Sequence, residues 1–378
     1  NVVVELRYSL GNWIKGNLNS ILEIDETLGW KLFDRIVGYF LGAGEEATES
    51  SLGEARRGGK ALVESRRTYH YAINSPIGNC ANALINSVPE DIKPALPKGV
   101  KSRIEQLMTA PGEGADHATS IFMMQLNWLM HVDPLWASES LIPILSFEHS
   151  LAEPAWDGFI RAGQRPTDQV LTEIRPLLND FVPWMNTLYW EDDMYKYAIQ
   201  WLAQMYMFLP EADPNQLSAP EMRSILRYST ADARNEFILW LGQVAQVDEN
   251  GWNLYVIPFV KNVWPLESKY RTSASVKAWI NLLDDTGESF PEVYETIKKF
   301  LNPVAYSDFW LYRFTHDLKD EECLTKRFPE LVLDMMDRVT GTQISPELKA
   351  IIEIVIESAP ELETDRRYQR LFELVEMN

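Results

Sequence analysis

The sequence predicts an all-α fold, built either as a HEAT-like α-solenoid or as an irregular stack of antiparallel helix pairs. Three observations lead to this prediction. Apolar residues recur at steps of three and four along most of the chain, long alternating apolar–polar stretches are absent, and a tryptophan–aliphatic pair recurs at a fixed interval in the second half. The 378 residues, of which 46% are hydrophobic, suffice for one extended helical array.

The first 112 residues are predicted to form two helical segments joined by a mobile connection. Helical steps such as Leu28, Leu32 and Ile36 indicate a helical segment over residues 1–42. Gly, Glu and Ser dominate residues 43–64, which predicts the mobile connection, and residues 65–112 return to a helical pattern. The only strand-like stretch, residues 2–8, could equally be the end of a helix.

A basic run lies at the end of this connection, with a single acid inside it. Such a run is usually a solvated face, and we interpret it so. It consists of Arg56, Arg57, Lys60, Arg66 and Arg67.

Residues 113–378 are predicted to form a helical-repeat domain. Trp201-Leu202, Trp240-Leu241 and Trp279-Ile280 recur at 39-residue intervals, and each pair precedes an acidic turn and a second helix. A period near 40 residues with two helices is that of HEAT-like repeats, in which successive pairs share one core. The distance from each Trp to its turn varies, so an irregular helical domain remains the alternative.

Several helix starts in this domain are marked by a capping residue before a proline. The signals are Asp133-Pro134, Ser218 through Glu221, and Ser345-Pro346-Glu347. A proline in the first helical turn has no N–H to leave unpaired, and the preceding side chain accepts from the backbone of that turn. We therefore expect helices to begin at these positions.

Charge and cysteine content limit the partners and the compartment. The net charge of −20 repels phosphate backbones and anionic membranes, so neither nucleic acid nor a membrane is expected as a partner. Two distant cysteines, Cys80 and Cys323, form no disulfide framework and indicate a reducing compartment. With no signal-peptide pattern and no apolar run near the roughly 18 residues that span a bilayer, a cytoplasmic protein is expected.

The motifs of common catalytic, nucleotide-binding and metal sites are absent from the sequence. The five histidines are scattered, and there is no Cys-x-x-Cys, phosphate-binding glycine loop or nucleophile elbow. The sequence therefore predicts no catalytic residue, no cofactor and no metal ligand in this chain. A partner-binding site is predicted where aromatic residues adjoin acids, because Tyr and Trp are enriched at interface hot spots. It consists of Tyr189, Trp190, Glu191, Asp192 and Asp193.

Several stretches between Ala72 and the C-terminus carry a family resemblance. They are residues 72–78, 83–85, 133–136, 141–145, 153–159 and 359–362, followed by 365–368 and Leu371. They look like the helical-repeat regions of prokaryotic anti-phage defence proteins, in particular those that follow a sirtuin-like NAD-consuming domain. The resemblance implies a C-terminal module that senses an invader component or scaffolds an assembly. The NAD-hydrolysing residues would belong to a domain outside this chain, so no catalytic residue is transferred.

The leading expectation is therefore a non-catalytic protein-interaction module, the sensor or scaffold part of a bacterial anti-phage defence protein. Its partner would be a protein such as a phage component, a second copy of the chain, or both. The alternative is an enzyme, a hydrolase or nucleotide-processing enzyme, with a motif-less active site between helices. A deep pocket that joins His131 or His149 to two buried carboxylates would favour this alternative over the interaction module. A pure oligomerisation scaffold is a third possibility.

Overall fold

The fold is all-α, as the sequence predicts. The computed structural model describes residues 2–53, 56–57, 60–61, 65–89, 92, 95–163, 165–185, 188, 192–304, 314, 323–342 and 344–377. The chain folds into two compact units: unit 1 is Asn1–Gln204 with Leu209–Gln216, and unit 2 is Met205–Phe208 with Leu217–Asn378. The HEAT-like solenoid remains a prediction.

Unit 1 begins with two long helices, α1 (Val2–Ile24) and α2 (Glu26–Gly42). Asp25 separates them and caps α2, because its carboxylate accepts a hydrogen bond from the Leu28 backbone N–H at 2.9 Å. α1 packs against both α2 and α4 (Pro76–Asn86). Residues 2–8 lie in α1, so the strand alternative for this stretch is wrong.

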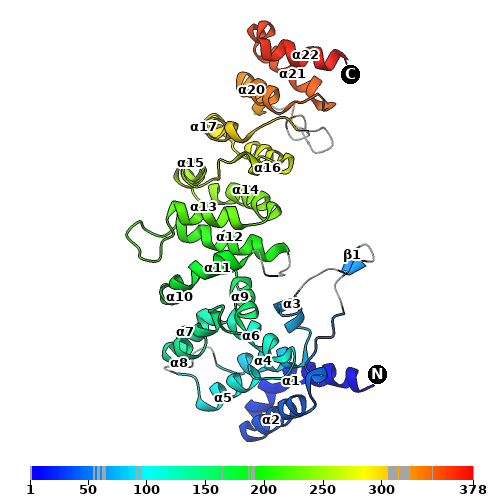
Figure 1. Cartoon of the computed structure of the whole chain (residues 1–378), viewed down its shortest axis with the longest axis vertical. Coiled ribbons are helices and arrows are strands. Elements are labelled where there is room, and N and C mark those ends of the chain that lie inside the picture. The colour runs from blue at the N-terminus through cyan, green and yellow to red at the C-terminus, as the bar shows by residue number, and fades with distance from the viewer. Residues whose placement is uncertain are drawn as a thin grey trace. The chain divides into compact units, whose positions relative to one another are not determined.

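The predicted connection over residues 43–64 contains the 3₁₀-helix η1 (Glu45–Ala47) and a short antiparallel hairpin. Strand β1 (Arg56–Arg57) pairs with β2 (Lys60–Ala61), with Arg57 opposite Lys60 (Figure 1). The Gly-Gly dipeptide between the strands is typical of two-residue hairpin loops. The interpretation of residues 56–67 from their charge alone overlooked this Gly-Gly hairpin signal.

The remaining elements of unit 1 follow the hairpin along the chain, and the last of them ends in unit 2 with residues 205–207. They are α3 (Tyr69–Ala72), α5 (Lys98–Leu107), α6 (Gly114–Met124), α7 (Leu126–Val132), α8 (Pro134–Ser140), η2 (Ile142–Leu145), α9 (Ala152–Arg161), α10 (Asp168–Ile174), η3 (Arg175–Leu177), α11 (Leu178–Trp184) and α12 (Asp192–Met207). α6 contacts α3, α4, α5 and α9, so the boundary predicted at residue 113 falls inside a packed unit. α6 and α9 approach closely at Gly158, where an added Cβ would lie 2.1 Å from the Ser120 carbonyl oxygen.

Unit 2 is a succession of helix pairs (Figure 1). Its elements are α13 (Ala219–Tyr228), α14 (Ala231–Ala245), η5 (Trp252–Val256), α15 (Ile257–Asn262), η6 (Ser268–Tyr270), α16 (Ser273–Asp284), η7 (Gly287–Ser289), α17 (Phe290–Ile297), η8 (Lys298–Phe300), α19 (Leu324–Arg327), α20 (Pro329–Val339), α21 (Glu347–Ser358), η10 (Pro360–Thr364) and α22 (Arg366–Met377). α14 packs on α16 and α15 packs on α17, while α20, α21 and α22 contact one another. Equivalent helices of successive pairs therefore meet.

The three periodic tryptophans lie in helices, as predicted. Trp201 lies in α12, Trp240 in α14 and Trp279 in α16. Trp201 and Trp279 are buried, whereas Trp240 is partly exposed. The Trp279 ring stacks on that of Phe300 with centroids 5.7 Å apart, so it joins α16 to η8 at the end of α17, within one helix pair.

The predicted helix starts are confirmed. Asp133 caps α8 by accepting from the Trp136 N–H, and Ser218 forms a capping box with Glu221 at the start of α13. The Ser345 hydroxyl accepts from the Glu347 N–H at 3.3 Å where α21 begins. Within the part of the chain that the structure describes, no helix is long and apolar enough to cross a membrane.

Candidate functional site

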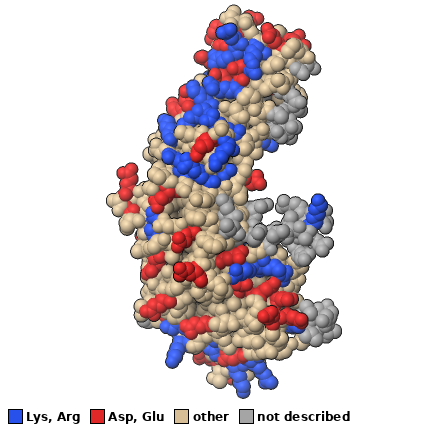
Figure 2. Space-filling view, viewed as in Figure 1, with Lys and Arg blue, Asp and Glu red and all other residues tan. Residues whose placement is uncertain are grey.

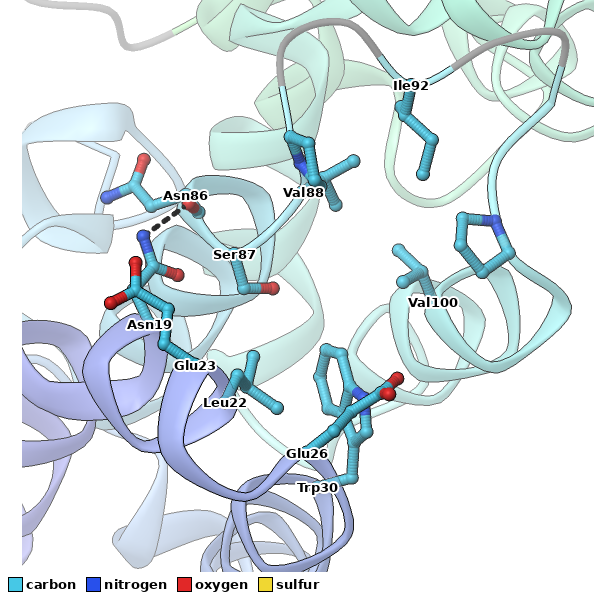
Figure 3. Close-up of a pocket in the computed structure, with 12 residues that line it drawn as sticks. Asn19, Leu22, Glu23, Glu26, Trp30, Asn86, Ser87, Val88, Ile92 and Val100 are labelled. Carbon is cyan, nitrogen blue, oxygen red and sulfur yellow. Dashed lines mark hydrogen bonds between the residues drawn. The ribbon is translucent and has the colours of Figure 1, made fainter.

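A groove of about 560 Å³ opens in unit 1 between the α1–α2 corner and the segment that leads into α5 (Figure 3). Apolar side chains line the groove on both sides, and one indole ring and two carboxylates complete the lining. These residues are Leu22, Val88, Ile92, Val100, Trp30, Glu23 and Glu26.

Helical spacing brings one wall of the groove together. Asn19 lies three and four residues before Leu22 and Glu23 near the end of α1, and Glu26 and Trp30 lie four apart in α2. The Asn19 side-chain amide donates to the Asn86 carbonyl at 2.7 Å, which ties α1 to the end of α4 at the rim (Figure 3).

The Trp30 ring is held in place by neighbours outside the groove. The Arg103 guanidinium lies 4.3 Å from its centroid, a cation–π contact, and Phe33 meets it edge-on at 6.1 Å. Arg103 is itself fixed by two hydrogen bonds of 2.7 Å to the carboxylate of Asp34. The indole is therefore positioned before any ligand binds.

The rim of the groove is negative. Glu23 and Glu26 are exposed, and neither forms an ion pair with any residue that the structure describes. An apolar floor, an aromatic ring and unpaired carboxylates together suit a group with an apolar stem and a cationic head. Lys and Arg side chains have this form.

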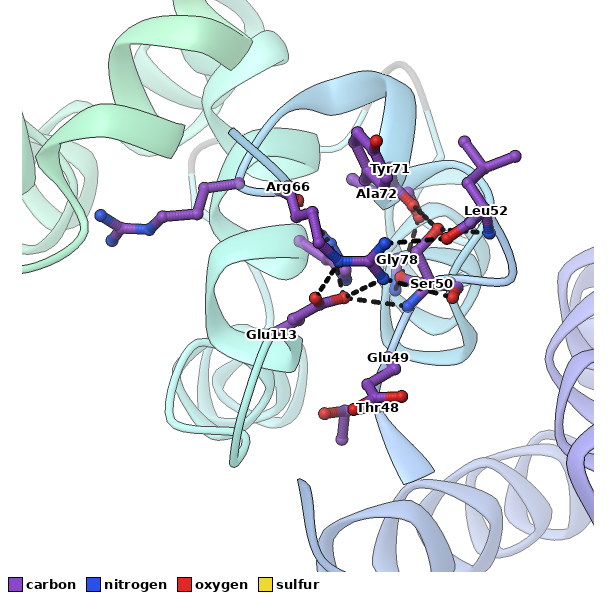
Figure 4. A network of polar contacts seen from close by, with 12 residues as sticks. Thr48, Glu49, Ser50, Leu52, Arg66, Tyr71, Ala72, Gly78 and Glu113 are labelled. Atoms are coloured by element: carbon purple, nitrogen blue, oxygen red, sulfur yellow. Dashed lines mark hydrogen bonds and ion pairs between the residues drawn. The ribbon is translucent and has the colours of Figure 1, made fainter. Parts of the chain in front are cut away.

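A second polar cluster lies where α3, α4, α6 and α9 meet (Figure 4). The interpretation of residues 56–67 as a solvated face is wrong for Arg66 and Arg67, which are partly buried in ion pairs. Arg66 Nη2 lies 3.0 Å from Glu113 Oε2, and Arg67 lies 2.9 Å from Asp116 and 3.1 Å from Glu153. Acidic residues at α6 and α9 form these ion pairs and hold the arginines partly buried.

Glu113, the N-cap residue of α6, and His117, one turn later in the helix, form the centre of this cluster. Burial raises the pKa of Glu113, but hydrogen bonds from Arg66 and from the Ser50 N–H outweigh it, and the net pKa lies below the usual range. Burial lowers the pKa of His117, whose Nε2 lies 3.1 Å from the Arg66 carbonyl oxygen. Because the imidazole is fully buried, a dissolved substrate cannot reach it. We assign the cluster a structural role.

The two histidines considered for the enzyme alternative lie elsewhere. His131, in the last turn of α7, and His149, whose Nδ1 accepts from the Leu151 N–H at 3.1 Å, are both exposed. Neither lines the groove of unit 1. Among the described residues, no group of three or more His, Cys, Asp and Glu could hold a metal ion.

The predicted partner-binding residues are not placed by the structure. Tyr189, Trp190 and Glu191 lie outside the described residues. Asp192 and Asp193 open α12, and only their backbone is described. This site stays a prediction.

No protein-family model, curated protein or solved structure matches this chain.

Proposed function

We propose that this chain is a non-catalytic protein-binding helical module, the sensor or scaffold part of a bacterial anti-phage defence protein. The observation that supports this function is the groove of unit 1, in which a prepositioned indole and two unpaired carboxylates surround an apolar floor. Its volume lies within the range of about 300–1,000 Å³ that is usual for ligand sites. Among the described residues, its lining includes no histidine or cysteine to act as a base or nucleophile.

The groove suits a segment of a partner protein in which a Lys or Arg is flanked by apolar residues. The aliphatic stem would cover Leu22 and Val100, and the cation would lie near Trp30 and the two carboxylates. One exposed cation–π contact contributes about 0.5–1 kcal/mol, and an exposed ion pair contributes about 0.2–1 kcal/mol. Most of the affinity would therefore come from the apolar neighbours of the cation.

The defence role rests on the family resemblance of residues 72–378, with a phage component as the partner. NAD hydrolysis would then be carried out by a domain outside this chain, and binding in the groove would report the invader to it. The two free cysteines, Cys80 and Cys323, accord with a cytoplasmic location.

A pair of short peptides tests the chemistry of the groove. Ac-Leu-Lys-Leu-Leu-NH₂ and its Glu-for-Lys counterpart would be titrated while the indole N–H resonance of Trp30, assigned with Trp30→Phe, is followed. We expect the Lys peptide to shift this resonance and the Glu peptide to leave it in place. The double variant Glu23→Gln/Glu26→Gln should weaken binding about threefold to tenfold.

Glu249→Gln is the matched control, since Glu249 is an exposed acid of unit 2. It should leave the affinity unchanged. Equal binding of both peptides, or a double variant that binds like the unmodified chain, would overturn the groove assignment.

A plaque assay tests the defence role. Cells that express the whole protein carrying this chain would be infected, and Glu23→Lys/Glu26→Lys would be compared with Glu249→Lys at equal abundance. Loss of protection in the groove variant alone is the expected result. Full protection by the groove variant would contradict the role of the groove in sensing, even if the peptides bind.

A further inference from the structure

The C-terminal end of α15 is contacted at one edge of unit 2 by α13 and by the residues that follow α17. Arg223 of α13 donates through Nε to the Val263 carbonyl at 3.2 Å and through Nη2 to the Asn262 carbonyl, at the end of α15. Phe300, which ends η8 directly after α17, contacts the ring of Trp264 with centroids 6.5 Å apart. These contacts make the edge continuous across three helix pairs.

This edge is basic although the chain carries a net charge of −20. Figure 2 shows Lys and Arg gathered over the region of unit 2 where Figure 1 places α15 and α17. Cations near helix C-termini complement the helix dipole, which accounts for Lys261, Lys298 and Lys299. It does not account for the cations of the loop after α15. The basic edge is defined as Arg227, Lys261, Lys269, Arg271, Lys298 and Lys299.

Two exposed apolar residues adjoin the basic edge in sequence. Arg227 Nη2 lies 2.7 Å from Glu267 Oε1, which joins the end of α13 to the loop after α15. Tyr228 and Leu266, the neighbours of these two residues in sequence, are 41% and 56% exposed. Buried Trp264 and Tyr270 anchor the loop that carries Leu266, and Tyr228 is the last residue of α13.

We propose that the basic edge binds an acidic protein surface, with Tyr228 and Leu266 as the apolar centre of the contact. Aromatic and Arg side chains around an apolar centre are typical of protein interfaces. A phosphate backbone fits less well, because Glu267 and Glu295 lie among the cations and the whole chain is strongly negative. The basic edge is independent of the groove of unit 1.

The test uses the whole chain and three labelled probes. They are an amphipathic helical peptide of Glu and Leu, the same peptide with Gln in place of Glu, and an oligothymidine of about twelve nucleotides. Fluorescence anisotropy at low and high salt measures binding. We expect the acidic peptide to bind at least about tenfold more tightly than its Gln counterpart, with weakening as salt rises.

Charge and apolar variants separate the two parts of the contact. Lys269→Glu/Lys299→Glu should weaken the acidic peptide about tenfold or more, and Leu266→Ser should weaken it at all salt concentrations. Lys349→Glu, an exposed cation of α21, is the matched control and should change little. The positions changed are exposed, and circular dichroism would confirm that the helices remain.

Three results would overturn the proposal. Oligothymidine that binds more tightly than the acidic peptide would make the basic edge a polyanion site. An equal effect of Lys349→Glu would make the attraction nonspecific. If Leu266→Ser binds the acidic peptide as tightly as the unmodified chain does, Leu266 is not part of an apolar centre of the contact.

Discussion

Arg66 and Glu113 form the ion pair that anchors both ends of the segment containing the β1–β2 hairpin. Glu113 Oε2 accepts from the Ser50 N–H at 3.0 Å, before the hairpin, and from Arg66 Nη2 at 3.0 Å, after it. Arg66 also donates through Nη1 to the Leu52 carbonyl at 2.8 Å. One carboxylate at the N-cap of α6 therefore closes the loop from which the hairpin extends (Figure 4).

Glu113→Gln should destabilise unit 1 by about 1–3 kcal/mol, because it leaves the partly buried Arg66 guanidinium without a counter-charge. Urea unfolding measures the free energy of unfolding. Asp34→Asn is the matched control: its bidentate pair with Arg103 is half exposed at the acid, so its loss should cost below about 1 kcal/mol. Equal losses in the two variants would contradict the anchoring role of Glu113.

Acidification should weaken unit 1 in two steps. The pKa of His117 lies below its ordinary 6.5 because the ring is buried, with Glu113, Asp116 and Arg66 as the charges near it. The pKa of Glu113 lies below its ordinary 4.5. In both cases the unfolded chain takes up a proton at higher pH than the folded one, so unfolding is favoured as pH falls.

The first loss of stability, which comes from His117, should begin below about pH 6.5. The second, which comes from Glu113, should begin below about pH 4.5. His117→Gln should lower stability at neutral pH, because the buried site is disturbed, and should flatten the curve between the two steps. Urea midpoints measured across this pH range give the result. An undiminished slope in His117→Gln would assign the first step to another group.

The helical fold was predictable because its signals are local. The cap at Ser218 is satisfied three residues later by Glu221, and the pattern that places Trp279 in a helix repeats within α16. The Gly-Gly hairpin dipeptide was equally local but was overlooked beside the charges of its neighbours.

The candidate sites were not predictable because their parts are distant in sequence. Arg66 lies 47 residues before its partner Glu113 in the sequence, and Arg67 lies 86 residues before its partner Glu153. Charge composition alone therefore predicts that both arginines are exposed to solvent. The groove likewise joins Glu23 and Trp30 to Val100, which are unremarkable surface or helix positions until α1, α2 and α5 pack. The spacing of these residues in the sequence does not indicate that they lie close together in the fold.

The two cysteines should differ strongly in reactivity. Burial raises the pKa of Cys80 to about 12 and excludes solvent from its sulfur, whereas Cys323 is partly exposed. A thiolate-specific reagent should therefore modify one thiol in the native chain and the second only in denaturant. Cys323→Ser should abolish the fast reaction. A fast reaction that persists in this variant would show that α4 opens under native conditions.

The contact of α6 with α9 should depend on the absence of a side chain at residue 158. A Cβ on Gly158 would lie 2.1 Å from the Ser120 carbonyl oxygen, a backbone atom that cannot rotate away, so Gly158→Ala must push the two helices apart. We expect a loss of about 2–4 kcal/mol in the free energy of unfolding.

Gly38→Ala in α2 is the matched control, because no atom lies within 4 Å of the new methyl group. There the same change should stabilise the helix by about 0.5–1 kcal/mol, since alanine loses less backbone entropy. Opposite signs at the two glycines in urea unfolding would confirm the close packing, and a neutral Gly158→Ala would contradict it.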